Sequence, residues 1–302
     1  MRRVATHAQR RVSALSAGVL LVLVLGSTLV IAKGALRHVG PLTLAALRYG
    51  LAALILLPLA VRQEARRWPW PPRVWLRLAA IGLGFYALGN GALFVGLQYV
   101  SAATASLLLG LVPLVVLLGG VIWLREAPTR VQLVGMGVAL VGTLLFFAPG
   151  LAPGEPLGLA ILAIGMLGNA SLGVLGRPLA RDRQVGPVTL AAAPLALGGL
   201  VLLPIAVARE GAPQLALPEV ATVFWLALVN TALAYVLYNH LLQALGAFEV
   251  SALTSLSPVV TAVGAWLVLN ESLAILQVVG MILTVGGVIL IQAARQARSS
   301  GA

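Results

Sequence analysis

Long apolar runs, separated by short polar or turn-rich segments, occupy most of the chain. Each run is about 20 residues long, which is what an α-helix needs to cross a hydrocarbon core about 30 Å thick. The runs lack the apolar–polar alternation of a half-buried strand, and open sheet edges are not viable in lipid, so we predict helices. The pattern predicts an all-helical membrane protein with ten transmembrane helices, over residues 13–32, 41–61, 75–97, 102–124, 130–148, 157–177, 187–208, 219–242, 248–269 and 273–293.

Charge and composition support this interpretation and orient the chain. A soluble domain has about 25% charged residues, whereas this chain has 9% and is 60% hydrophobic. A net charge of +12 would indicate nucleic acid in a soluble protein, but here it is typical of arginine-rich cytoplasmic loops, and no nucleic-acid partner is expected. With the amino terminus inside, 16 basic residues fall in inner segments, and only Lys33, Arg37 and Arg209 fall in outer ones. We therefore predict that both termini are cytoplasmic.

The second and seventh predicted spans have nearly the same sequence. The stretch GPLTLAALRYGLAALILLPLAV at 40–61 aligns without gaps on GPVTLAAAPLALGGLVLLPIAV at 186–207, with 13 of 22 positions identical. Further matches follow at an offset of 145: Pro113 with Pro258, Glu126 with Glu271, Gln132 with Gln277, Gly135 with Gly280. A repeat of five spans must cross the membrane in the opposite sense, as in secondary transporters whose substrate site lies near the midplane. We predict two inverted five-helix repeats, 1–148 and 149–302, although an inverted repeat could also build a channel.

Each half carries a membrane proline, a glutamate about 13 residues later and a glycine in the next helix. In this pattern the chain resembles the drug/metabolite transporter superfamily, specifically its ten-span EamA branch, over nearly its whole length. Span 1 resembles the family in Gly26, Ser27, Thr28 and Lys33, although Leu25 replaces the usual tryptophan. The resemblance implies export of metabolites or amino acids across the bacterial inner membrane. It also implies a cavity lined chiefly by spans 1, 3, 4, 6, 8 and 9.

Arg48 is the one basic residue inside a predicted span. It lies about 10 Å into span 2 from the outer end, where a charge costs several kcal/mol unless it is paired or reaches the interface. Two interpretations stand: a structural arginine that bonds backbone carbonyls or snorkels outward, or a cation that meets a substrate carboxylate. All eight acidic residues lie in or near predicted loops, so no mid-membrane acid is expected to pair with it.

Polar and aromatic side chains within other spans are the further candidates for a substrate cavity. An asparagine in a span either bonds a neighbouring helix or lines a cavity, and aromatic rings with a few polar groups suit a small-molecule pocket. Tyr86 and Asn90 share a face of span 3 because they are four residues apart. The other candidates are Ser106, Asn169, Asn230, Tyr235, Asn239 and Ser251.

Energy coupling has two open alternatives. Proton-coupled exporters need a titratable group within the membrane, and only Glu249 and His240, near the inner ends of spans 9 and 8, qualify. The sequence therefore predicts either coupling through these two residues, or uniport or exchange. Glu126 and Glu271 are expected to cap the helix that follows each of them. Pro113 and Pro258 each remove one backbone hydrogen bond and are candidate pivots.

Several classes of protein are excluded. No phosphate-binding glycine loop with a lysine is present, so no ATP-driven pump is expected. The three histidines lack metal spacing and there is no cysteine, so no metal, cofactor or enzyme activity is predicted. The sequence predicts an inner-membrane secondary transporter, an exporter of small metabolites or amino acids by alternating access, in contact with membrane lipids. The alternatives are an exporter of hydrophobic or toxic compounds, and a non-transporting or lipid-flipping protein.

Overall fold

The fold is described from a computed structural model that covers residues 16–28, 31–32, 35, 38–64, 70–96, 99–100, 105, 108–150, 155–213, 215–269 and 273–300. No strand occurs within these ranges. Helix Ser16–Thr28 comes first. It is followed by α2 (Pro41–Glu64), α3 (Pro72–Ile81), η1 (Gly82–Gly89), α4 (Asn90–Gly96), α6 (Val112–Gly119), η2 (Gly120–Leu124), α7 (Arg130–Phe147), η3 (Ala148–Gly150), α8 (Pro156–Arg181), α9 (Pro187–Glu210), α10 (Leu217–Ala227), η4 (Leu228–Leu233), α11 (Ala234–Ala244), α12 (Ala247–Thr254), α13 (Ser257–Leu269) and α14 (Ile275–Ser300).

Eight helices in the described ranges are long and apolar enough to cross a membrane. They correspond to predicted spans 2, 3 and 5 to 10, and spans 3 and 8 each join several consecutive segments. The predicted first and fourth spans correspond to the shorter apolar helices Ser16–Thr28 and Leu108–Leu124. The all-helical membrane class is therefore confirmed for the described residues, whereas the number ten remains a prediction.

Helix starts follow from local chemistry. Proline stands at the beginning of α3, α8 and α9, where its missing N–H is not needed and its fixed φ suits the first turn. At α7 the Thr129 hydroxyl accepts from the Gln132 N–H, and the Gln132 side chain accepts from the Thr129 N–H. Two orphan N–H groups of α7 are thus satisfied by one reciprocal capping box.

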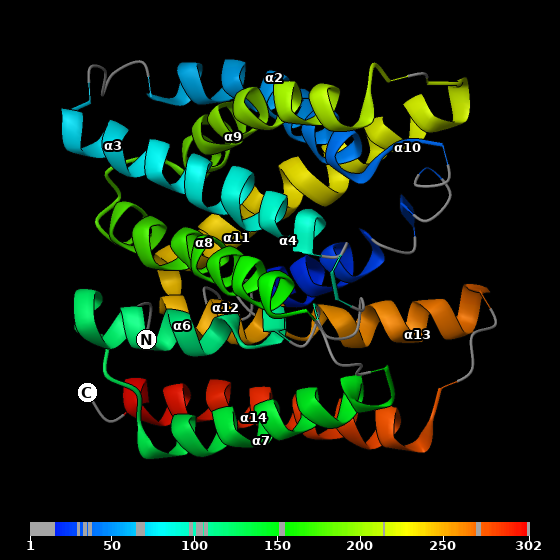
Figure 1. Cartoon of the computed structure of the whole chain (residues 1–302). Helices are drawn as coiled ribbons and strands as arrows, with labels where there is room; N and C mark the ends of the chain where they lie inside the picture. The colour runs from blue at the N-terminus through cyan, green and yellow to red at the C-terminus, as the bar shows by residue number, and fades with distance from the viewer. Residues whose placement is uncertain are drawn as a thin grey trace.

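Two antiparallel helix pairs form opposite edges of the bundle (Figure 1). The pair α7 and α14 lies along one edge, and α2 and α9 lie along the other, beside α3 and α10. Between them lie α8, α11, α12 and α6. Each edge pair joins the corresponding helices of the two sequence repeats, the second with the seventh span and the fifth with the tenth.

Glycines bring α7 and α14 into close contact. A Cβ on Gly135 would lie 2.7 Å from the Gly287 carbonyl oxygen, and one on Gly142 would lie 2.6 Å from the Gly280 carbonyl oxygen. Only glycine permits backbones to approach this closely. Gly135 and Gly280 are repeat equivalents, and so are Gly142 and Gly287. The contact is therefore reciprocal, as across a two-fold axis.

Two glutamates, buried Glu64 and exposed Glu210, tie α2 to α9 at both ends. Glu64, the last residue of α2, accepts a hydrogen bond from Gly186 N at the start of α9, at 2.5 Å. Glu210, the last residue of α9, accepts from Leu42 N and Thr43 N at the start of α2, at 2.9 and 2.8 Å. Glu64 and Glu210 stand 146 residues apart, at equivalent places in the repeat. Each helix thus ends in a carboxylate that caps its partner, where the helix dipole favours negative charge.

Irregular backbone also recurs at equivalent positions. The π-helices η1 and η4 begin at Gly82 and Leu228, 146 residues apart. Before α6 and α13 the chain makes a turn at Leu111 and at Ser255–Leu256. The helix is interrupted there, and Pro113 and Pro258 each occupy the second position of the segment that follows. Both predicted pivots therefore lie beside a real break in a helix.

Candidate functional site

Aromatic rings from three helices meet in the buried core. Tyr49 of α2 lies with its ring centroid 5.1 Å from that of Tyr86 in η1. Tyr86 lies 5.2 Å from Tyr235 of α11, and Phe85 lies 5.6 Å from Tyr235. The rings meet nearly edge to face, which is a favourable arrangement for aromatic pairs. We call these four residues the aromatic cluster.

Arg48 borders the aromatic cluster. It donates a hydrogen bond from Nη2 to the Tyr49 hydroxyl at 3.2 Å, and its guanidinium carbon lies 5.0 Å from the centre of that ring. Tyr86 and Tyr235 are also within electrostatic range of the guanidinium. Its Nε is buried and has no hydrogen-bond partner among the described residues, and the same holds for the Tyr86 hydroxyl. Buried polar groups without partners are destabilising, so this region holds donors with unused capacity.

Asn239 adds a donor and an acceptor to the same region. It is completely buried, and both its amide nitrogen and its amide oxygen are without partners in the part of the chain that the structure describes. Asn239 follows Tyr235 by four residues on α11, so the two side chains share one helical face. An unpartnered primary amide, one turn from an aromatic ring, is a group that a polar ligand could satisfy.

Asn230 joins the second half of the chain to the first helix. Its amide nitrogen donates to the carbonyl of Val24 at 2.5 Å and to the hydroxyls of Ser27 and Thr28 at 3.0 and 3.1 Å. Its amide oxygen is buried and unpartnered within the described ranges. Asn230 is thus mainly an interhelical contact, with one acceptor left over.

The π-helices set the register of these side chains. Asn230 lies in η4, five residues before Tyr235, and a π-helix repeats after more residues than an α-helix because its bonds run from i to i+5. Tyr86 lies in the corresponding π-helix η1. Such segments are frequent at functional sites. Here they bring one polar and one aromatic side chain toward the core.

The other candidates lie apart from the aromatic cluster or are already satisfied. Asn90 donates to the Phe85 carbonyl of its own helix at 2.8 Å, and Asn169 donates to the Gly165 carbonyl of α8 at 3.0 Å. Ser251 is buried on α12. Ser106 lies outside the described residues. The structure therefore brings together Arg48, Tyr86 and Tyr235, and Asn239 lies one helical turn from Tyr235 on α11.

Glu249 is held as a helix cap. Its Oε2 accepts from Gly246 N at 2.8 Å, and its Oε1 accepts from Gln132 Nε2 at 3.2 Å. Both carboxylate oxygens are therefore engaged at the start of α12, and one of them links α12 to α7. His240 is exposed on α11. A role for either residue in proton coupling remains a prediction.

The prediction that Glu126 caps the helix after it was wrong, because Thr129 and Gln132 already cap α7. Glu126 instead pairs with Arg177 of α8, with Nε and Oε1 2.8 Å apart, and accepts from Ala247 N at the start of α12 at 3.3 Å. Arg177 also donates from Nη1 to the Leu242 carbonyl at the end of α11. We call Glu126 and Arg177 the end latch, because together they join α8, α11 and α12 to the segment between η2 and α7. The equivalent Glu271 lies outside the described residues.

Four residues of interest were missed in the sequence. Tyr49 and Phe85 stand directly beside Arg48 and Tyr86, but nothing in the pattern distinguishes them from ordinary core residues. Glu64 and Glu210 could have been found, since the repeat alignment extends three residues beyond Val61 and Val207 to reach them.

Comparisons with known proteins agree with the membrane fold. The EamA-like transporter family matches residues 12–148 and 156–293. Relatives include an uncharacterized transporter, YyaM, of Bacillus subtilis (27% identical, covering 87% of this chain and 88% of the relative) and Protein PecM of Dickeya dadantii (30%, covering 74% and 75%). Another is an uncharacterized inner membrane transporter, YedA, of Escherichia coli (29%, covering 80% and 78%). A solved crystal structure shares the fold with a TM-score of 0.79 at 18% identity, over 94% of this chain and 98% of that one. The chain is an integral membrane protein that belongs to the EamA-like transporter family.

Proposed function

We propose that this protein is a secondary transporter that exports small polar metabolites or amino acids across the bacterial inner membrane by alternating access. One observation carries the proposal: donors and acceptors on Arg48, Tyr86 and Asn239 are buried without partners around the aromatic cluster. Leaving such groups unsatisfied destabilises the protein, and a polar substrate that reaches them would relieve this. A carboxylate meeting Arg48 and an amide or amine meeting Asn239 fit the chemistry.

The reciprocal contacts of the two edge pairs support inverted repeats. In each pair, two equivalent helices run antiparallel and make the same contacts with each other. Two oppositely oriented copies would form such pairs across a two-fold axis in the membrane plane. Two such halves have inward-open and outward-open states of similar energy. The proposed repeats are 1–148 and 149–302, with both termini cytoplasmic.

In this topology the end latch lies at the inner end of the bundle. It joins the segment after span 4 to the ends of spans 6 and 8 and to the start of span 9, so those helices cannot separate while it holds. We infer that release toward the cytoplasm requires the Glu126–Arg177 pair to open. The pair is half-buried, with side chains 25% and 11% exposed, so opening it also rehydrates both charges.

For energy coupling, the contacts favour uniport or exchange over a proton relay. A coupling carboxylate has to change its protonation state in each cycle. Glu249 accepts a hydrogen bond on each oxygen from groups that hold α12 and α7 in place, so protonating it would weaken those bonds.

The test is flux into proteoliposomes that contain the purified full chain. Labelled neutral and acidic amino acids are compared with a hydrophobic organic cation and with a fluorescent phospholipid. We expect saturable amino-acid flux, and Arg48→Gln should raise Km about tenfold or more, because a hydrogen bond to a charged group contributes about 1.5–3 kcal/mol. Arg209→Gln, an exposed arginine of α9, is the matched control and should leave Km unchanged.

Other outcomes separate the alternatives. Flux of the cation alone would make the protein an exporter of hydrophobic compounds. Exchange of the fluorescent phospholipid between leaflets, without amino-acid flux, would make it a lipid-flipping protein. Arg48→Gln with wild-type Km would assign Arg48 a structural role.

A further inference from the structure

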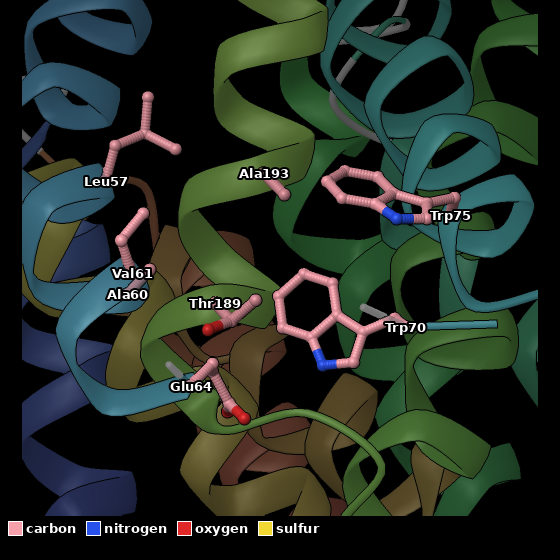
Figure 2. A pocket seen from close by; sticks show the side chains of 8 residues that line it. All are labelled: Leu57, Ala60, Val61, Glu64, Trp70, Trp75, Thr189 and Ala193. Atoms are coloured by element: carbon pink, nitrogen blue, oxygen red, sulfur yellow. The ribbon is translucent and has the colours of Figure 1, made fainter. Parts of the chain in front are cut away.

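A cavity of about 440 Å³ lies away from the aromatic cluster, where α2 ends and α3 begins. Figure 2 shows Leu57, Ala60 and Val61 of α2 on one side and Trp70 and Trp75 on the other, with α9 between them. The remaining lining residues are Ala193 and Thr189 of α9, and Glu64.

The walls of this cavity select an apolar occupant. Six of its eight lining residues are aliphatic or aromatic, and Val61 and Trp75 are 68% and 38% exposed. Glu64, the last residue of α2, lines the cavity and accepts a hydrogen bond from Gly186 N. A slot of this size and character suits a hydrocarbon chain rather than a polar metabolite or a headgroup.

The mouth of the cavity has a different character. Exposed Arg62 follows directly after Val61 of the wall, and exposed Arg73 lies between Trp70 and Trp75 in the sequence. Arg77 follows Arg73 within α3. Tryptophan and arginine gather where a helix meets the headgroup region, and basic pockets on the cytoplasmic side attract anionic headgroups.

The repeat provides an internal comparison. Five of the eight lining positions are identical 146 residues away, but Trp70 and Trp75 correspond to Ala216 and Ala221, and Ala193 corresponds to Leu47. The arginines differ as well, since 62, 73 and 77 correspond to Ala208, Glu219 and Val223. The two tryptophans, the small Ala193 and the arginines next to the lining residues in sequence therefore occur together in one half only. The cavity is not a by-product of the repeated fold.

We propose that this cavity binds one acyl chain of an anionic phospholipid from the cytoplasmic leaflet, and that Arg62 and Arg73 hold its phosphate at the rim. The lipid lies between α2, α3 and α9, and so fills the gap between helices of both halves. Its binding is independent of the transported substrate. A failure of amino-acid flux leaves this proposal intact, and the reverse also holds.

The experiment is native mass spectrometry of the purified full chain, titrated with phosphatidylglycerol or phosphatidylcholine of identical acyl chains. We expect tighter binding of phosphatidylglycerol, and Arg62→Ala with Arg73→Ala should weaken it about 25-fold, since one arginine near an anionic surface is worth about fivefold. Arg130→Ala, an exposed arginine at the start of α7, is the control and should change nothing.

A second variant tests the cavity itself. Ala193→Leu places in the cavity the side chain that the other half carries as Leu47, and it should abolish tight binding of both lipids. Ala208→Leu, exposed on the same helix, should bind as the wild type does. Equal affinity of the wild type for the two lipids would overturn the headgroup assignment. Unchanged binding in a folded Ala193→Leu protein would overturn the site. If Ala193→Leu is unstable, the test is the variant with Arg62→Ala and Arg73→Ala: unchanged phosphatidylglycerol binding in that variant would overturn the proposal.

Discussion

The carboxylates that tie α2 to α9 make a quantitative prediction about stability. Glu210→Ala removes the acceptor for Leu42 N and Thr43 N, two N–H groups at the start of α2 that bond it at 2.9 and 2.8 Å. Nothing else in the first turn of α2 replaces it, since that turn contains no acidic residue. Glu64→Ala removes the acceptor for Gly186 N alone.

The magnitudes follow from the number of bonds. Substituting a helix cap by alanine costs about 0.5–2 kcal/mol, and a hydrogen bond to a charged group contributes about 1.5–3 kcal/mol. Glu210→Ala, with two N–H groups left without a partner, should destabilise the protein by about 3 kcal/mol, at the upper end of these ranges. Glu64→Ala should cost about 1.5 kcal/mol. The double substitution should be additive, since the two sites lie at opposite ends of the pair and share no contact.

Thermal unfolding of the purified chain in detergent measures these differences. Each substitution should lower Tm, Glu210→Ala more than Glu64→Ala, and Glu210→Gln should recover part of the loss because its amide oxygen still accepts. Glu155→Ala is the matched control: Glu155 is an exposed residue at the start of α8 and makes no capping bond through its side chain. If Glu210→Ala matched Glu155→Ala, the carboxylate would not be capping α2, and the reciprocal arrangement would contribute nothing to stability.

Three further predictions concern the α7–α14 contact, the end latch and Glu249. Gly142→Ala should destabilise by about 1–3 kcal/mol because its Cβ meets the backbone of α14, whereas Gly137→Ala, open on the same helix, should be neutral or stabilising in thermal unfolding. Glu126→Gln should shift the protein toward the inward-open state. Because the chain lacks cysteine, a cysteine placed at Ser251 should then react faster with an impermeant maleimide from the inner side; an unchanged rate would argue against the latch. Glu249→Gln, which keeps an acceptor, should retain flux, and an uncoupler should leave the flux of both proteins unchanged. Loss of flux with normal folding would support proton coupling instead.

The periodicity and length of the apolar runs were sufficient to predict the helices. The internal backbone of those helices could not be predicted, because a π-helix depends on tertiary packing. Gly82 in η1, for example, lies where a Cβ would meet Leu197 and Pro194 of α9 at 2.9 Å. The turn at Leu111 shows the same limit: Pro113 predicts a weakness in the helix, but the position of the break depends on its neighbours.

The candidate site was predicted in part. Arg48 and Tyr86 stand out from the sequence because a charge or a polar ring within an apolar span needs an explanation. Asn90 and Asn169 stood out equally, yet each bonds a carbonyl of its own helical segment. Whether an amide turns inward to the core or back onto its own backbone depends on its rotamer and its neighbours, which a one-dimensional pattern does not contain. Asn239 is distinguished from them only by the structure.

The reciprocal contacts also bear on how a duplicated gene can diverge. Gly135 meets Gly287 and its repeat equivalent Gly280 meets Gly142, so a change in one half alters a surface that the other half must still fit. In this chain all four of these positions are glycine. The residues around the aromatic cluster differ between the two halves. Arg48 corresponds to Pro194, Tyr86 to Ala232 and Asn239 to Leu93. The two halves thus share the residues of the α7–α14 contact and differ at the positions around the aromatic cluster.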